Sequence, residues 1–156
     1  MIINDRCAGL LKGSKIIPSS ISQMLLDKFY PIIHVDRTIY PVYPDWMSEI
    51  KKNLHPELEL KGPDRFDVTK LERWLHPDQK RGYFIGSRQL YDELIVLDLL
   101  KYCINLADSL AIQKRGVKFF RRYFPEGIVP AWSSTVQYYS GGLRVPCLVE
   151  WNNEIS

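Results

Sequence analysis

Apolar residues recur at helical intervals in three short segments of the first half of the chain. Over residues 16–30 this spacing predicts a helix, and Ser20 with a glutamine three positions later is typical of a capping box at its start. The same periodicity predicts short helices over residues 44–54 and 68–76, with Asp67 as the N-cap of the second.

A different pattern, rich in β-branched and aromatic residues, covers residues 31–40 and predicts a strand. Pro41 and Pro44 follow it closely. Because a proline pushes the residue before it out of the α region, the chain should stay extended until the next predicted helix begins.

The longest apolar stretch covers residues 88–106, and Ser87 can cap it as a helix. At about 100° per residue its apolar side chains occupy nearly the whole circumference, which predicts a helix in the centre of the core. Asp108 can start a further short helix that Gly116 ends or interrupts.

The end of the chain alternates with the period of a strand. Residues 128–139 and 143–151 flank a Ser-Gly-Gly turn, which predicts a β-hairpin with positive φ angles at Gly141 and Gly142. The expected fold class is therefore α+β: several helices packed around a central apolar helix, with a small antiparallel sheet that includes the C-terminal hairpin.

Composition narrows this picture to one ordinary folded domain, residues 1–156. Apolar residues make up 46% and charged residues 25%, so the chain is not of the disordered class. Three widely spaced cysteines (Cys7, Cys103 and Cys147) argue against a disulfide framework and favour the cytoplasm. The N-terminal residues lack the apolar core of a signal peptide, and no stretch reaches the roughly 18 apolar residues of a membrane span.

Two of the three histidines occur in the same frame, Leu-His-Pro-acid, at His55 and His76. Each triplet follows a predicted apolar helical stripe, and proline cannot continue a helix, so we expect both triplets to end helices with the histidine at the negative end of the dipole. The alternative is a metal or acid–base site that adds Glu57, Asp78 or Asp45. The spacing gives it little support, because neither histidine belongs to a metal-binding helix motif.

The segment HVDR suggests a catalytic alternative. On a strand, His34 and Asp36 point to the same face, where a carboxylate can orient an imidazole as a general base. An alternating polar face is also what a half-buried strand ordinarily shows. The enzyme hypothesis places His34, Asp36, Asp45 and His55 around one cleft. Arg37 can bind an anion through its planar fork.

Residues 113–124 contain five basic side chains and no acid. As a helix they place the basic residues on an arc of roughly 120° and the aromatic residues on the other side. The basic residues are Lys114, Arg115, Lys118, Arg121 and Arg122. A basic face is most often only solvated, but this one can also lie along a phosphate backbone, with aromatic residues of the hairpin as stacking surfaces.

Nucleotide-binding glycine motifs and the serine-hydrolase motif do not occur in the sequence, so we expect no cofactor and no metal. The preferred interpretation is a binding or regulatory module that contacts nucleic acid or another polyanion through Lys114, Lys118, Arg121 and Arg122. Besides the enzyme hypothesis, a protein-interaction role through hairpin aromatics such as Trp132 and Trp151 stays open. No membrane partner is expected.

Three blocks, IHVDRTIYPVYPDWM, HPELELKGPDRFD and WLHPDQKRG, resemble a family of small uncharacterised bacterial hypothetical proteins. The likeness covers approximately residues 12–82 and continues more loosely through residues 112–124 and the hairpin. It implies a bacterial or phage-associated, cytoplasmic origin and transfers no functional residues. The ending at EWNNEIS is earlier than in similar chains, which leaves the completeness of the terminal sheet open.

Overall fold

A computed structural model describes residues 30–43 and 50–156. The helix predicted over residues 16–30 lies almost wholly outside the described residues, as does the first part of the one predicted over residues 44–54. The described remainder of the latter is not helical, since residues 50–53 form a strand.

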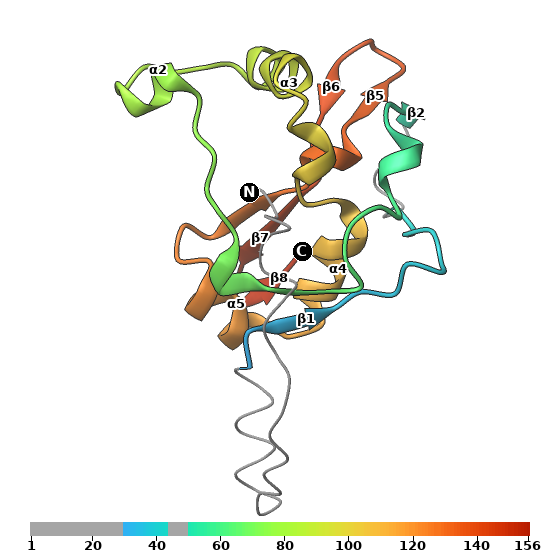
Figure 1. Cartoon of the computed structure of the whole chain (residues 1–156), viewed down its shortest axis with the longest axis vertical. Helices are drawn as coiled ribbons and strands as arrows, with labels where there is room; N and C mark the ends of the chain where they lie inside the picture. Colours follow the sequence, from blue (N-terminus) through green and yellow to red (C-terminus); the bar gives the residue numbers. More distant parts are fainter. Residues whose placement is uncertain (1–29, 44–49) are drawn as a thin grey trace, which may run out of the picture.

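The strands of the described chain form three small antiparallel sheets (Figure 1). Sheet by sheet, in spatial order, they are β1 (Ile32–His34) and β3 (Arg65–Asp67); β2 (Ile50–Asn53), β5 (Val136–Tyr138) and β6 (Leu143–Arg144); and β4 (Ile128–Pro130), β7 (Cys147–Trp151) and β8 (Glu154–Ile155). The predicted hairpin is confirmed in part: its arms pair as β5 with β6 and β4 with β7, and Gly141 in the turn has φ 83°. The positive φ predicted at Gly142 is wrong. The strand predicted over residues 31–40 is confirmed only at β1.

Short helices connect these sheets. The α-helices of the described chain are α2 (Pro77–Lys80), α3 (Ser87–Val96), α4 (Leu106–Gln113) and α5 (Val117–Tyr123); the 3₁₀ helices are η3 (Pro56–Leu58), η4 (Val68–Lys70), η5 (Leu100–Tyr102) and η6 (Trp132–Ser134). Helices and small antiparallel sheets thus make a mixed fold within one compact chain, in agreement with the expected class.

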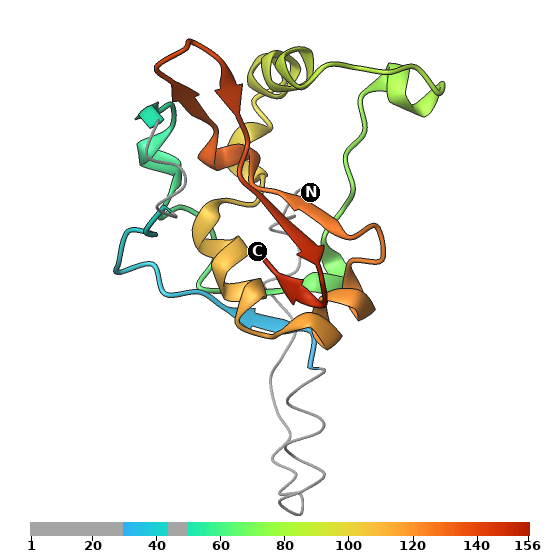
Figure 2. The ribbon, with the colours of Figure 1, turned by 180° about the vertical axis from the view of Figure 1, so that it is seen from behind.

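The main core lies where α4 and α5 pack against the first and third sheets (Figure 2). Ile33 of β1, Ile112 of α4, Phe119 and Phe120 of α5, and Val129 of β4 are all at most 1% exposed. Each such side chain contributes about 1.5–3 kcal/mol through burial. The position of α4 and α5 is therefore fixed by apolar packing on their inner sides.

Helix α3 is shorter than the predicted helix over residues 88–106. It ends at Val96, and Asp98 adopts the left-handed conformation with φ 55°. The Leu99 N–H donates to the Leu94 carbonyl (2.9 Å) and the Asp98 N–H to the Ile95 carbonyl (3.0 Å), the bond pair of a Schellman motif. The apolar stretch therefore folds as two short helices, α3 and η5, joined by a C-cap.

The central position of this stretch is not confirmed either. Within α3 only Tyr91 and Leu94 are buried, and they belong to a second, smaller cluster with Leu100 and Cys103. Val96 is 78% exposed. The apolar side chains around this helix are therefore not all buried, because nothing in the described chain covers the outer side of α3.

Both Leu-His-Pro triplets start helices, so the prediction that they end helices is wrong. His55 is the N-cap of η3 and His76 the N-cap of α2, with a proline at the first helical position in each case. At His76 the ring Nδ1 accepts from the Asp78 N–H (3.1 Å), while Gln79 accepts from the His76 N–H (3.1 Å), completing a capping box. Proline at the first helical position costs no hydrogen bond, because the N–H of any residue at this position would have no partner within the helix.

The remaining helix predictions are confirmed in part. Asp67 caps η4 by accepting from the Thr69 N–H, but the helix stops at Lys70 instead of residue 76. Residues 71–86, called the arm below, then leave the body of the molecule, carry α2, and return to α3 (Figure 1). Asp108 lies in the first turn of α4, and Gly116, with φ 79°, separates α4 from α5 as predicted.

Candidate functional site

The four basic residues predicted to bind a polyanion are all exposed where α4 meets α5. Lys114 ends α4, whereas Lys118, Arg121 and Arg122 belong to α5. Residues three and four apart share one side of a helix, so the three α5 side chains emerge together, opposite Phe119 and Phe120 in the core. We call this set of four residues the basic corner.

The fifth basic residue of the segment points elsewhere. Arg115 donates to the backbone carbonyls of Ile32 (2.7 Å) and Tyr30 (2.8 Å), and its guanidinium lies 4.5 Å from the centroid of the Phe119 ring. Arg115 therefore ties α4 to the β1 segment. The continuous arc of five basic residues is divided because Gly116 changes the direction of the chain.

Two acids border the basic corner. Arg121 forms a double hydrogen bond with Glu150 of β7, with Nε 3.0 Å and 2.9 Å from the two carboxylate oxygens. These bonds hold the pKa of Glu150 below its ordinary value. On the other side, Lys114 contributes to the lowered pKa of Asp36, although hydrogen bonds from the Thr38 hydroxyl and N–H are the main causes.

The catalytic candidates do not assemble around one described cavity. His34 and Asp36 are exposed at the end of β1. The Asp36 carboxylate accepts a hydrogen bond from the Thr38 N–H. His55 is the N-cap of η3, and Figure 1 shows this helix next to β2 and away from β1. Asp45 lies outside the described residues, so the four-residue enzyme site stays a prediction.

His55 has its own partners. Its Nε2 lies 2.7 Å from the Tyr91 hydroxyl and its Nδ1 3.4 Å from Glu57. This carboxylate–imidazole–phenol series resembles a proton relay, but Tyr91 is 6% exposed and burial raises its pKa. The arrangement therefore satisfies a buried hydroxyl and keeps the phenol protonated.

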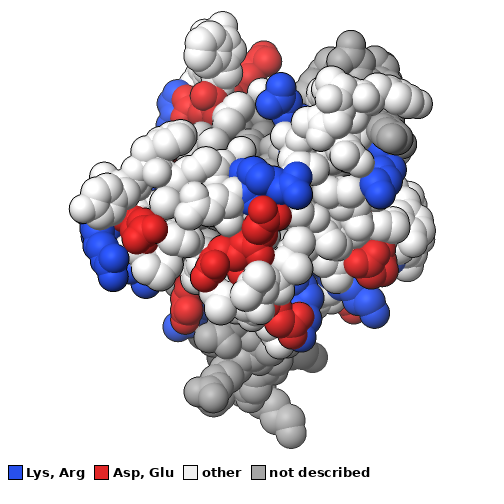
Figure 3. Space-filling view, turned by 90° about the horizontal axis from the view of Figure 1, so that it is seen from above, with Lys and Arg blue, Asp and Glu red and all other residues white. Residues whose placement is uncertain are grey.

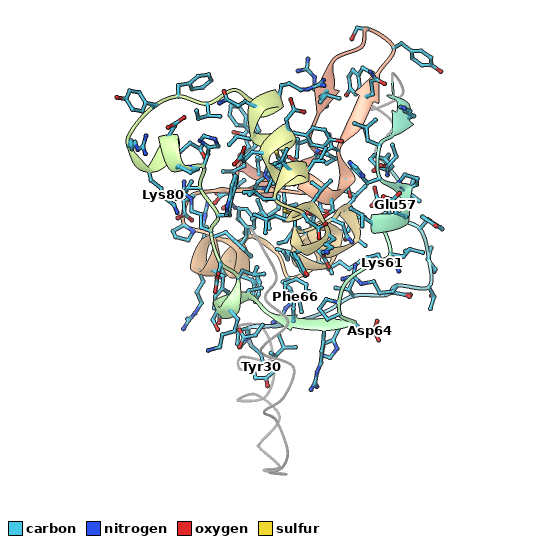
Figure 4. All side chains as sticks on the ribbon, turned by 45° about the horizontal axis from the view of Figure 1, so that its top comes forward. Tyr30, Glu57, Lys61, Asp64, Phe66 and Lys80 are labelled. Carbon is cyan, nitrogen blue, oxygen red and sulfur yellow. The ribbon has the colours of Figure 1, made fainter. Side chains whose placement is uncertain are left out.

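The two Leu-His-Pro histidines do not meet. Lys80 of α2 and Glu57 of η3 are labelled on opposite sides of Figure 4, and Figure 1 places the two helices likewise. His76 is 8% exposed and packs edge-on to Trp74, with ring centroids 6.4 Å apart. In the described part of the chain, no group of three histidine, cysteine or acidic side chains is placed to hold a metal ion.

Sequence reasoning missed a buried polar network around Arg37. Its Nη2 lies 2.5 Å from Asp108 Oδ1 and its Nη1 donates to the Asn105 side chain (3.2 Å). Asn105 in turn donates to the carbonyls of Leu58 and Lys61 (both 2.9 Å). The anion that Arg37 binds is thus an internal carboxylate. A side chain at Gly62 would lie 2.8 Å from this guanidinium, which explains the glycine there.

A second buried carboxylate, Glu59, lies next to this network. It is 2% exposed and accepts hydrogen bonds from Ser134 (2.8 Å), Asn53 (2.5 Å) and the Tyr43 hydroxyl. Burial and the neighbouring Glu59 raise the pKa of Tyr43. The network joins four segments that are distant in sequence. No sequence motif within any of these segments predicts it.

The comparisons with known proteins add no family to this description: no family model, no curated protein and no solved structure matches the chain. The resemblance described above stays a prediction. The described chain also contains no helix with the length and apolarity needed to cross a bilayer.

Proposed function

We propose that the chain is a small cytoplasmic binding or regulatory module that contacts nucleic acid or another polyanion through the basic corner. The observation that supports this function best is the exposure of all four basic residues on a corner that the core holds in place. The free thiols of Cys103 and Cys147 fit a reducing compartment.

The binding mechanism is electrostatic. Each phosphate that a cation neutralises releases condensed counterions, so the affinity falls as salt rises, with a log–log slope of about −0.9 per phosphate on duplex DNA. Like charges three or four residues apart destabilise a helix, and Lys118 stands in this relation to both Arg121 and Arg122. A bound polyanion would relieve that repulsion, which makes the corner a better phosphate surface than four scattered cations.

The experiment is fluorescence anisotropy with a labelled oligonucleotide, single-stranded and duplex, at about 50 and 200 mM salt. The test variant replaces Lys114, Lys118, Arg121 and Arg122 with glutamine. The control replaces Lys70, Lys80, Arg81 and Arg88, which are also two exposed lysines and two exposed arginines. Arg81 is the C-cap of α2 and Arg88 lies on α3, and this side of the molecule mixes acids and bases (Figure 3).

We expect the test variant to lose binding at low salt and the control to keep most of it, because net charge is equal in the two variants. The salt slope of the test variant should also be smaller by up to about 4, one unit for each lost phosphate contact. Equal, weak binding by the wild type and both variants would refute the proposal. An equal loss of oligonucleotide binding in both variants would show that binding depends only on net charge. This result would refute the basic corner as the binding site.

A further inference from the structure

A groove separate from the basic corner runs between the arm and the body of the molecule. It has a volume of about 420 Å³, within the range of small-molecule sites in proteins. One wall comes from the arm and from α3, including Trp74 and Leu90; the other comes from β4, η6 and residues 143–147, including Trp132 and Leu143. Two tryptophans from segments distant in sequence therefore line one concave surface.

The groove is mainly apolar and is not filled by the described chain. Trp74, Trp132 and Leu143 pack with part of their surface on the smaller core cluster and leave the rest facing the groove. The exposed Cys147 also lines it. An apolar ligand surface placed here would gain free energy by leaving water.

The charges of the groove are unevenly compensated. Arg73 pairs with Glu126 at 3.2 Å, so these two lining residues neutralise each other. Arg144 also lines the groove and lies 5.8 Å from the Tyr138 ring centroid. Within the described part of the chain, no carboxylate pairs with Arg144. The groove thus presents one uncompensated guanidinium beside two indole rings.

We propose that this groove binds a small amphipathic organic anion, with its aromatic or aliphatic body against Trp74 and Trp132 and its acidic group at Arg144. A guanidinium offers parallel donors that fit a carboxylate, sulfonate or phosphate. This inference is independent of polyanion binding at the basic corner, because none of the four corner residues lines the groove.

The test uses two fluorescent probes that differ in one group. 8-Anilinonaphthalene-1-sulfonate carries the anion, whereas N-phenyl-1-naphthylamine has the same rings without it. We expect the sulfonate probe to bind at one site per chain. Arg144→Gln should weaken it about three- to tenfold and leave the neutral probe unchanged, since exposed charge pairs are worth a fraction of a buried one. Arg81→Gln, which removes an equal charge from the arm outside the groove, is the matched control.

Alkylation of Cys147 locates the probe. Iodoacetamide labelling of Cys147, read by peptide mass spectrometry, should slow when the sulfonate probe is saturating. Buried Cys103 should stay unlabelled with and without the probe, which shows that the protein remains folded. Protection of Cys147 together with the selective Arg144→Gln effect would support the proposal. Equal probe binding by Arg144→Gln and wild type would overturn it. So would labelling of Cys147 at an unchanged rate, or loose binding of several probes per chain.

Discussion

Arg37 Nη2 lies 2.5 Å from Asp108 Oδ1, and these two residues are 71 positions apart in the chain. Their side chains are 9% and 1% exposed, so the pair is an internal one. Burial raises the pKa of the Asp108 carboxyl, and the Arg37 guanidinium opposes this rise. The pair therefore links the segment after β1 to the first turn of α4.

Replacing Arg37 with methionine should destabilise the protein by about 3–5 kcal/mol at neutral pH, because it leaves the Asp108 charge buried without its counter-ion. The double variant Arg37→Met, Asp108→Asn should recover a large part of this loss, since asparagine can still accept the Asn105 N–H. Urea unfolding measures both. A cost below about 1 kcal/mol for the single variant would show that the pair is not desolvated in solution.

The Arg37→Met deficit should also depend on pH. Without the guanidinium, the folded-state pKa of Asp108 lies further above its unfolded value, so the folded state binds the proton more tightly than the unfolded state does. Stability of the variant is then fully present below the ordinary aspartate pKa and is lost as the pH rises above it. Unfolding curves from about pH 4 to pH 7 should show the deficit growing with pH.

The histidine cap of α2 allows a conservative test. His76→Asn keeps a side-chain acceptor for the Asp78 N–H, whereas His76→Ala removes it; loss of a side-chain cap usually costs about 1 kcal/mol. We expect the alanine variant to be the less stable of the two by that amount. Amide exchange in residues 78–81 should rise in the alanine variant only. Equal exchange in both would show that the contact with Trp74, and not the cap, holds the helix.

Glu150 pairs with Arg121, one of the four residues of the proposed polyanion site. If the basic corner binds a polyanion, Glu150→Gln should tighten binding more than Glu154→Gln does. Both changes remove one acid from neighbouring strands of the same sheet, but only the first releases the Arg121 fork. The anisotropy assay at low salt measures the difference. Identical affinities would show that Arg121 keeps its partner and does not contact the polyanion.

Because of Cys103, we expect the folded protein to become less stable at alkaline pH. Burial raises the pKa of its thiol to about 11 from 9.0, and the thiol donates to the Leu99 carbonyl. Between these two values the unfolded state releases the thiol proton and the folded state keeps it, so stability falls as the pH rises, by up to about 1.4 kcal/mol per pH unit. Cys103→Ala removes this dependence. The stability of the wild type relative to the variant should therefore fall between about pH 9 and pH 11.

Local chemistry was predictable where one conformation was strongly favoured. Asp67 was identified as a cap because it precedes an apolar stripe, and Gly116 as an interruption because glycine enters the left-handed region freely. The hairpin turn at Gly141 followed from the same property. In each case the decisive interaction lies within a few residues.

The failures arose where two local interpretations compete or where the partner is distant. Proline after His55 and His76 can stop a helix or occupy its first position, and the hydrophobic pattern alone does not decide between them. The C-cap at Asp98 could not be predicted from the sequence, because the residue with the left-handed conformation is an aspartate and not the usual glycine. The partners of Arg37 and Glu59 come from segments that only the tertiary fold brings together.

The pairing of β2 with β5 joins Asn53 to Val136, and Ser134, two positions earlier, supplies a hydrogen bond to Glu59. A ribosome adds about 5–20 residues per second, so β2 and the Glu59 carboxylate emerge several seconds before their partners. During synthesis the edge of β2 is therefore unpaired, and water takes the place of Ser134 at the Glu59 carboxylate. The pairing of β2 with β5 can therefore form only late in synthesis, whereas both strands are present from the start when a finished chain refolds from denaturant.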